Sequence, residues 1–135
     1  MKQHFDEIII HLPKKAEYVG FIRLTVSGLL SKVGFDIDTV EDIKVVVSEI
    51  CNKIVSSKCK SERHHYDVKF HLFDNGFKAF FKVSSCIAEN LFEGESGEFA
   101  KAIISSLTDE FSIECDDYCT ITIGKYLGDS INANR

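Results

Sequence analysis

The spacing of hydrophobic residues predicts two consecutive amphipathic helices in the first half of the chain. In residues 17–33 and 38–57, apolar side chains recur every three or four positions, which is the period of a helix with one buried face. Gly34 is expected to end the first helix, because glycine readily adopts the conformation that follows a helix. Asp38 or Thr39 is expected to cap the second helix with a side-chain oxygen.

A different period, alternation of apolar and polar residues, predicts a β-hairpin in the middle of the chain. Residues 65–73 and 77–85 alternate on either side of the turn sequence Asp-Asn-Gly. The Asn75-Gly76 dipeptide favours a type I′ turn, whose twist suits a hairpin.

The remaining segments complete an α+β pattern. Residues 5–13 predict a strand, 84–97 a polar loop, 98–110 a helix, and 111–115 with 118–127 a second hairpin. The element order β-α-α-β-β-α-β-β favours a two-layer sandwich, in which helices cover one face of a mostly antiparallel sheet.

Composition and charge narrow the functional classes. The 135 residues are 44% apolar, which suits one globular domain over residues 1–135. The 16 basic residues are spread along a chain of net charge −5, so no direct nucleic-acid partner is expected. No apolar run approaches the roughly 20 residues that span a bilayer, and residues 1–6 are too polar for a signal peptide. We therefore expect a cytoplasmic protein with no membrane partner.

Five cysteines without a secretory signal favour reduced thiols, since an odd number cannot all pair within one chain. Cys115 and Cys119 flank a segment that is better explained as a hairpin turn than as a metal site. Cys59 with His64 and His65 is also a poor zinc template. No metal site is expected from the cysteines, and their roles stay open.

Three segments resemble a known family. They are AEYVGFIRLTVSGLLSKVGFDIDTVEDIKVVVSEICN at 16–52, SLTDEFSIE at 106–114 and TITIGKYL at 120–127. Together they make the chain similar to the anti-sigma-factor serine kinases of the RsbW and SpoIIAB type, in the GHKL ATPase superfamily. The resemblance implies an α+β sandwich that binds ATP and Mg²⁺ between its helices and a lid. It also implies a protein that sequesters a sigma factor and phosphorylates a serine of an antagonist protein.

The family's first nucleotide motif, E-x-x-x-N, is only half present. The resemblance places the general base at Glu49, but the position of the Mg²⁺-binding asparagine holds Lys53. A charged lysine has no lone pair to offer a metal. Asn52 lies one residue early, about 100° around the helix, which leaves a shifted metal site as an open alternative.

The second motif, D-x-G-x-G, has lost its adenine-binding aspartate. Counted from the hairpin turn, that position holds Val83, whose side chain cannot accept a hydrogen bond. Asp74 in the turn is no substitute, because it lies at the opposite end of the strand.

The third motif, the lid with its G-x-G, is also altered. Gly94 and Gly97 remain nearby, but Glu93, Glu95 and Glu98 place carboxylates where a triphosphate needs donors and positive charge. Acidic residues at a helix start suit the helix dipole and need no ligand.

Two functional hypotheses follow. The first is an anti-sigma-factor-like binding protein that acts in partner switching. It has lost the ability to bind ATP and uses no cofactor. In it, Lys53 pairs with Glu49, Glu93 or Glu95 and replaces the cofactor electrostatically. The alternative is an active ATP-dependent serine kinase that uses Glu49 as base and Asn52 for Mg²⁺.

Two further expectations concern partners. Arg23 matches a family arginine that contacts the sigma factor and the antagonist, and a guanidinium can bind a partner carboxylate through several donors. The apolar segment EIIIHL at 7–12 favours a homodimer, although Ile8 to Ile10 could instead complete the sheet of one protomer.

Overall fold

The computed structural model describes residues 4–57 and 64–127. In chain order its elements are β1 (Asp6–Pro13), a 3₁₀ turn η1 (Ala16–Tyr18), α1 (Val19–Val33), α2 (Ile37–Ser56), β2 (His65–Phe73), β3 (Gly76–Ser84), α3 (Ser85–Glu89), α4 (Gly94–Leu107), β4 (Glu110–Cys115) and β5 (Tyr118–Tyr126). The five strands form one antiparallel sheet in the order β1-β2-β3-β5-β4. The α+β class predicted from the sequence is confirmed.

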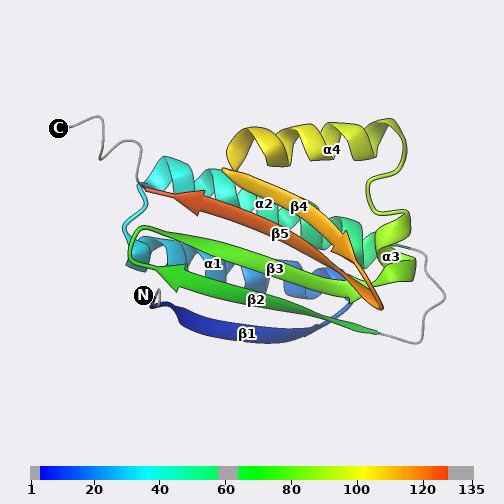
Figure 1. Ribbon diagram of the computed structural model, residues 1–135, viewed down its shortest axis with the longest axis horizontal. Coiled ribbons are helices and arrows are strands. Elements are labelled where there is room, and N and C mark those ends of the chain that lie inside the picture. The colour runs from blue at the N-terminus through cyan, green and yellow to red at the C-terminus, as the bar shows by residue number, and fades with distance from the viewer. Residues whose placement is uncertain (1–3, 58–63, 128–135) are drawn as a thin grey trace.

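The helices lie on one side of the sheet, and the other face is open. Figure 1 shows α1 and α2 behind the strands, with α4 alongside β4 at the edge. The inward positions of the strands and the apolar stripes of α1 and α2 form the core, in which Ile22, Ile50, Phe70, Phe81 and Ile121 are at most 1% exposed. None of the helices in the described ranges is long and apolar enough to cross a membrane.

The junction between the first two helices follows the predicted pattern, with a different capping residue. Gly34 ends α1 at φ 109°, a left-handed conformation that glycine adopts without strain. The cap of α2 is Asp36 rather than Asp38 or Thr39, because its carboxylate accepts a hydrogen bond of 2.8 Å from the Thr39 backbone N–H. Hydrogen bonding from Thr39 also lowers the pKa of Asp36.

The β2–β3 hairpin is confirmed, but its turn is not type I′. Phe73 pairs with Gly76, so Asp74 and Asn75 form the turn and Gly76 belongs to β3. Neither central residue has the positive φ that type I′ requires. Glycine is needed at position 76 for a close approach to β5, since a Cβ there would lie 2.5 Å from the Lys125 carbonyl oxygen.

The segment predicted as a polar loop, 84–97, is largely helical. It contains α3, and α4 begins at Gly94, four residues before the predicted start. Ile87 and Leu91 are 1% and 4% exposed, so their burial against the core holds the segment in place. At the other end, Glu110 belongs to β4 and not to the predicted helix.

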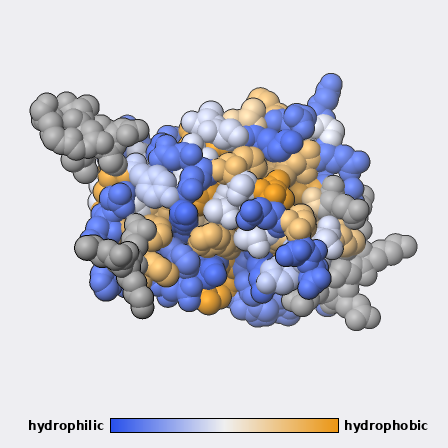
Figure 2. All heavy atoms as spheres, viewed as in Figure 1, coloured by the Kyte–Doolittle hydropathy of each residue, from blue (hydrophilic) through white to orange (hydrophobic). Residues whose placement is uncertain are grey.

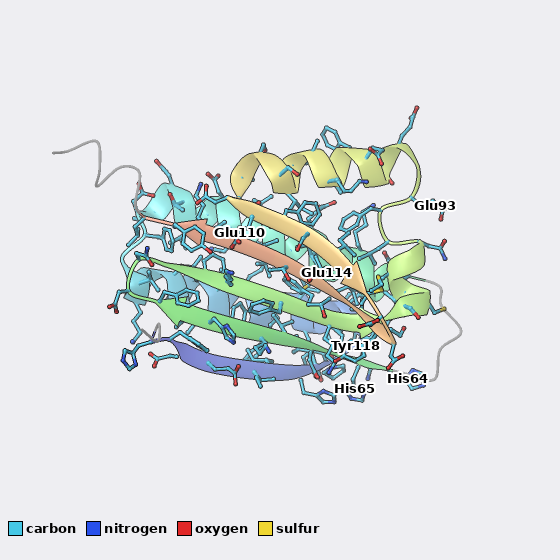
Figure 3. All side chains as sticks on the ribbon, viewed as in Figure 1. His64, His65, Glu93, Glu110, Glu114 and Tyr118 are labelled. Carbon is cyan, nitrogen blue, oxygen red and sulfur yellow. A yellow bond between two sulfur atoms is a disulfide. The ribbon has the colours of Figure 1, made fainter. Side chains whose placement is uncertain are left out.

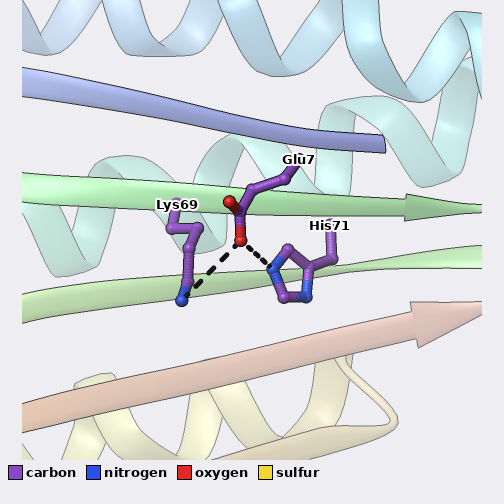
Figure 4. A network of polar contacts seen from close by, with 3 residues as sticks. All are labelled: Glu7, Lys69 and His71. Carbon is purple, nitrogen blue, oxygen red and sulfur yellow. Dashed lines mark hydrogen bonds and ion pairs between the residues drawn. The ribbon is translucent and has the colours of Figure 1, made fainter. Parts of the chain in front are cut away.

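Polar cross-strand pairs on the open face link the edge strand β1 to β2. His71 and Glu7 face each other across the strands, with 2.8 Å between His71 Nε2 and Glu7 Oε2, and Lys69 Nζ lies 4.0 Å from the same oxygen (Figure 4). A second cross-strand pair, His11 with Asp67, lies further along.

The end of β1 is joined to the end of α2. The Lys14 ammonium donates a hydrogen bond of 2.9 Å to the Ser57 carbonyl oxygen, immediately after α2. The Lys14 backbone N–H donates to the His64 carbonyl oxygen at 2.7 Å, just before β2. A cation at the carbonyl end of a helix is favourable to the helix dipole.

Substitution of two helical glycines by alanine is expected to change the free energy of unfolding in opposite directions. A Cβ on Gly97 in α4 would lie 2.1 Å from the backbone carbonyl carbon of Phe92, whereas one on Gly28 in α1 would meet nothing within 4 Å. We expect Gly97→Ala to lower the free energy of unfolding by about 1–3 kcal/mol through overpacking. Gly28→Ala should raise it by about 0.5–1 kcal/mol, because alanine loses less backbone entropy in a helix.

Urea unfolding followed by circular dichroism measures both changes in the full chain. Equal effects of the two substitutions would contradict the close contact between α4 and Phe92.

Candidate functional site

The polar residues singled out on α2 lie on its outward side. Ile50, Cys51 and Ile54 are fully buried, so the helix period turns Asn52 to the exterior and leaves Glu49 and Lys53 half-buried. The amphipathic pattern of α2 therefore determines which way the candidate base and the lysine point.

A hollow of about 340 Å³ lies between the end of α2 and the start of α4. It is lined by Lys53, Ser56, Ser57, Asn90, Leu91, Glu93 and Ser96. The first three come from the end of α2, and the others come from the connection between α3 and α4 and the first turn of α4, where Figure 3 labels Glu93. We call this hollow the α2–α4 cleft. Its lining is polar apart from Leu91.

Lys53 enters the α2–α4 cleft, but it does not form the ion pair expected from the sequence. Its ammonium donates to Ser96 Oγ at 3.4 Å, and within the described ranges no salt bridge joins it to Glu49, Glu93 or Glu95. Long side chains at exposed positions gain little from ion pairing, so the short serine on α4 is the closer partner. That expectation was wrong, and Lys53 links the two helices instead.

Glu49 and Asn52 stand apart from the cleft. Neither side chain lines it, and neither has a hydrogen bond or salt bridge to another residue of the described ranges. Glu49 thus presents a free carboxylate on the outer side of α2. The structure does not bring it together with Lys53 and the lid glutamate Glu93.

Val83, at the position of the family's adenine-binding aspartate, is part of the core. It is 3% exposed and pairs with Cys119, itself 1% exposed, on the neighbouring strand β5. Ile87 and Leu91, from the segment that follows, close over the same region of the core. Val83 does not line the α2–α4 cleft; it borders a different hollow of about 270 Å³, together with Tyr66 and Ser84.

Sequence reasoning missed a buried pair beside Val83. Tyr66, 2% exposed, occupies an inward position of β2, and its hydroxyl lies against the Cys51 thiol of α2. Burial raises the pKa of Cys51 to about 12 and the pKa of Tyr66 further above its usual value, so both stay neutral. The sequence did contain a clue. Tyr66 occupies an inward position of an alternating strand, and Cys51 lies on the apolar face predicted for the helix that packs on it.

The two glycines of the altered lid have structural roles in α4. Gly94 begins the helix at φ 76°, and Gly97 is buried against the Phe92 backbone. Glu93 is the residue before the helix, and its side chain makes no capping hydrogen bond. The backbone at this helix start is used for packing, and neither glycine lines the cleft.

The cysteines differ from the prediction of reduced thiols. Cys115 and Cys119, at paired positions of the predicted hairpin, form a disulfide. An odd count leaves at least one cysteine unpaired but does not prevent the others from pairing, and strand register brings these two together. Cys51 is a buried free thiol, while Cys59 lies outside the described residues. In the described ranges, no group of three or more metal-binding side chains is present.

Arg23 is exposed on α1 between two exposed apolar residues. Phe21 and Leu24 are 53% and 74% exposed. No carboxylate of the described ranges forms a salt bridge with Arg23. Its guanidinium is therefore available to another molecule.

Comparison with known proteins places the chain in a family, although no protein-family model matches it. Serine-protein kinase RsbW of Bacillus thuringiensis (strain Al Hakam) is 32% identical over 145 residues, which cover 94% of this chain and 89% of that protein. Serine-protein kinase RsbW of Bacillus cereus (strain G9842) is 31% identical with the same coverage. The chain therefore belongs to the RsbW family of serine-protein kinases, the anti-sigma-factor kinase family that its sequence segments resemble.

Proposed function

We propose that this protein is an anti-sigma-factor-like regulator that binds a sigma factor, its antagonist protein or both, and that it has lost nucleotide binding. In this proposal the chain is a single GHKL-like domain of the cytoplasm, and its function is sequestration in a partner-switching pathway. The observation that carries the loss of nucleotide is the burial of Val83, which is 3% exposed at the adenine position. Adenine recognition at this position needs a side chain that accepts a hydrogen bond, and the buried side chain of Val83 cannot accept one.

The residues of the α2–α4 cleft do not fit ATP and Mg²⁺. Its one cationic side chain is Lys53, and Glu93 adds a carboxylate to the same lining. Glu95 lies exposed in the first turn of α4, where a triphosphate would approach, whereas Glu98 is paired with Lys101 at 3.2 Å. Repulsion by Glu93 and Glu95, with no oxygen ligand at position 53, opposes a metal–phosphate complex.

An active serine kinase is the second candidate. It is favoured by the relatives, which are named serine-protein kinases, and by Glu49, whose half-buried carboxylate has no partner in the described ranges. In this alternative Glu49 is the general base, Asn52 binds Mg²⁺, and ATP is the cofactor. A general base must face a reacting hydroxyl, and Glu49 lies outside the cleft that would hold the phosphates.

Calorimetric titration with ATP and ADP, with and without Mg²⁺, separates the two candidates. We expect no binding by the wild type at millimolar nucleotide. Lys53→Asn should not restore binding either, because Val83 still provides no acceptor for adenine. Submillimolar, Mg²⁺-dependent binding by the wild type that Lys53→Ala abolishes would contradict the loss of nucleotide binding and favour the kinase alternative.

The exposed part of α1 around Arg23 is the proposed contact surface for the protein partner. Phe21 and Leu24 supply apolar area, and Arg23 supplies an unpaired, multidonor cation for a partner carboxylate. Apolar residues with a central arginine are typical of the side chains that contribute most to protein–protein affinity.

Substitution of Arg23 tests this surface. Arg23→Ala should weaken binding to the cognate sigma factor or antagonist at least about tenfold, since a truncated interface arginine costs roughly 1–2 kcal/mol or more. Lys32→Ala, on the same helix and with a side chain 71% exposed, is the matched control and should leave affinity unchanged. Surface plasmon resonance with each purified sigma factor of the source genome gives both values. Equal affinities for wild type and Arg23→Ala, in a folded variant, would remove Arg23 from the interface.

A homodimer through the open sheet face is the proposed assembly. Of the three consecutive isoleucines, Ile8 and Ile10 pack against the core, whereas Ile9 is 59% exposed on the open face. Phe5 and Tyr118, 45% and 44% exposed, add to this face. Figure 2 shows apolar side chains in patches among hydrophilic ones on the same side of the molecule. An uncovered sheet with exposed aromatic residues favours association with a second copy.

Ile9→Asp should therefore convert the dimer into a monomer at micromolar concentration. Ile37→Asp, at a residue 79% exposed on the helical side, is the control and should leave the dimer intact. Light scattering distinguishes a species of 15.2 kDa from one of twice that mass. A wild type that is already monomeric would contradict the proposed assembly.

A further inference from the structure

The Cys115–Cys119 disulfide joins positions that the backbone already holds together. The two cysteines are directly paired residues at the tip of the β4–β5 hairpin, only four positions apart in sequence. The turn between them is closed by a hydrogen bond of 2.8 Å from the Asp116 N–H to the Tyr118 carbonyl oxygen. A disulfide that closes so short a loop removes less unfolded-state entropy than one that closes a long loop. The contribution of this disulfide to the free energy of folding is therefore small.

The two cysteine residues differ in exposure. Cys119 is 1% exposed on the inner side of the sheet, whereas Cys115 is exposed on the edge strand β4. Cys115 also lines a hollow of about 580 Å³ on the open side, together with Phe80, Tyr118 and neighbouring polar residues. Because thiol–disulfide exchange requires a thiolate to reach a sulfur atom, only Cys115 can be attacked in the folded protein.

Exposed acidic residues are the sequence neighbours of Cys115 at the hairpin tip. Glu114, Asp116 and Asp117 are exposed and line the same hollow, and Figure 3 labels Glu114 near the hairpin tip. In the described ranges none of the three forms a salt bridge. The nearby Lys82 places its ammonium over the Tyr118 ring, 4.0 Å from the centroid. The field at Cys115 is therefore negative, and it lowers the local concentration of anionic reactants.

We propose that Cys115–Cys119 is a reversible thiol-exchange site, attacked at Cys115 and selective for cationic or neutral thiols over anionic ones. In the first step an incoming thiolate forms a bond to Cys115 Sγ, the bond between the two cysteines breaks, and Cys119 takes the electron pair and then a proton. A second thiol attacks the mixed disulfide on Cys115 and releases that thiolate. The disulfide gains two electrons, and two molecules of thiol are oxidised to their own disulfide.

Reduction leaves the sheet and the backbone pairing of the hairpin tip intact. A protonated Cys119 is a small apolar side chain that suits its buried position beside Val83. The pairing of β4 with β5 from Glu110 to Glu114 does not depend on the sulfur bond. This site is independent of the proposed regulatory function, since its chemistry requires neither nucleotide nor a protein partner.

The test uses the full-length oxidised protein and three thiols of different charge: cysteamine, 2-mercaptoethanol and glutathione. Loss of the disulfide is followed by acid quenching, alkylation and peptide mass spectrometry, with rates normalised to thiolate concentration. We expect glutathione to react at least about tenfold more slowly than cysteamine at low ionic strength. In about 0.5 M salt the ratio should fall below about threefold, because salt screens the field. The first mixed disulfide should form on Cys115.

Charge variants isolate the cause. Asp116→Asn with Asp117→Asn should reduce the cysteamine-to-glutathione ratio at low salt to within about threefold. Asp38→Asn with Asp42→Asn changes net charge equally at the start of α2, at the opposite end of the molecule from the hairpin tip (Figure 1), and should leave the ratio unchanged. Equal rates for all three thiols, first attack at Cys119, or thiols that stay free in air-oxidised protein would each overturn the proposal.

Discussion

The burial of one face of α2 against the sheet is the interaction on which the rest of the structure depends. Val47, Ile50 and Ile54 are fully buried, and they meet the inward residues of the central strands, including Phe81 and Ile121. Each such side chain removed from water contributes roughly 1.5–3 kcal/mol, so the helix cannot rotate without a large loss of stability. The outward stripe is fixed as a consequence. Glu49, Asn52 and Lys53 point where they do because their apolar neighbours point the other way.

The same burial fills the space around Val83, the position that the family resemblance assigns to adenine binding. Tyr66, Cys51 and Val83 fill the space beneath α2, and none of the three carries a charge in this environment. A nucleotide pocket requires a polar group that the ligand can reach from solvent. These three residues instead stabilise the folded protein by excluding water. In the proposed function, the valine at this position leaves apolar core where the resemblance implies an adenine-binding aspartate. The α2–α4 cleft is lined by other residues and does not include Val83.

Local patterns were sufficient for most of the fold. The period of residues 17–33 and of residues 65–73 predicted a helix and a strand at those places, since one buried face is required in each case. Long-range packing decided what the patterns could not. Gly76 looked like a turn residue, yet its place is set by the close approach of β5, and α3 is helical because Ile87 and Leu91 reach the core. For the site, the family motifs located Lys53 and Val83, but the partner Ser96 and the bond between Cys115 and Cys119 depend on tertiary geometry.

The hydrogen bond from Lys14 to the Ser57 carbonyl gives the N-terminal segment an influence on the candidate site. Ser57 lines the α2–α4 cleft, although no residue of the first strand does. The position of Lys14 depends in turn on the register of β1 against β2, in which Pro13 pairs with His65. A one-residue slip of the edge strand would displace the ammonium by about 3.3 Å and leave the last carbonyl of the α2 segment without its donor. The position of Ser57 in the cleft lining therefore depends on the register of β1. A substitution in the N-terminal strand can change the cleft without altering any residue that lines it.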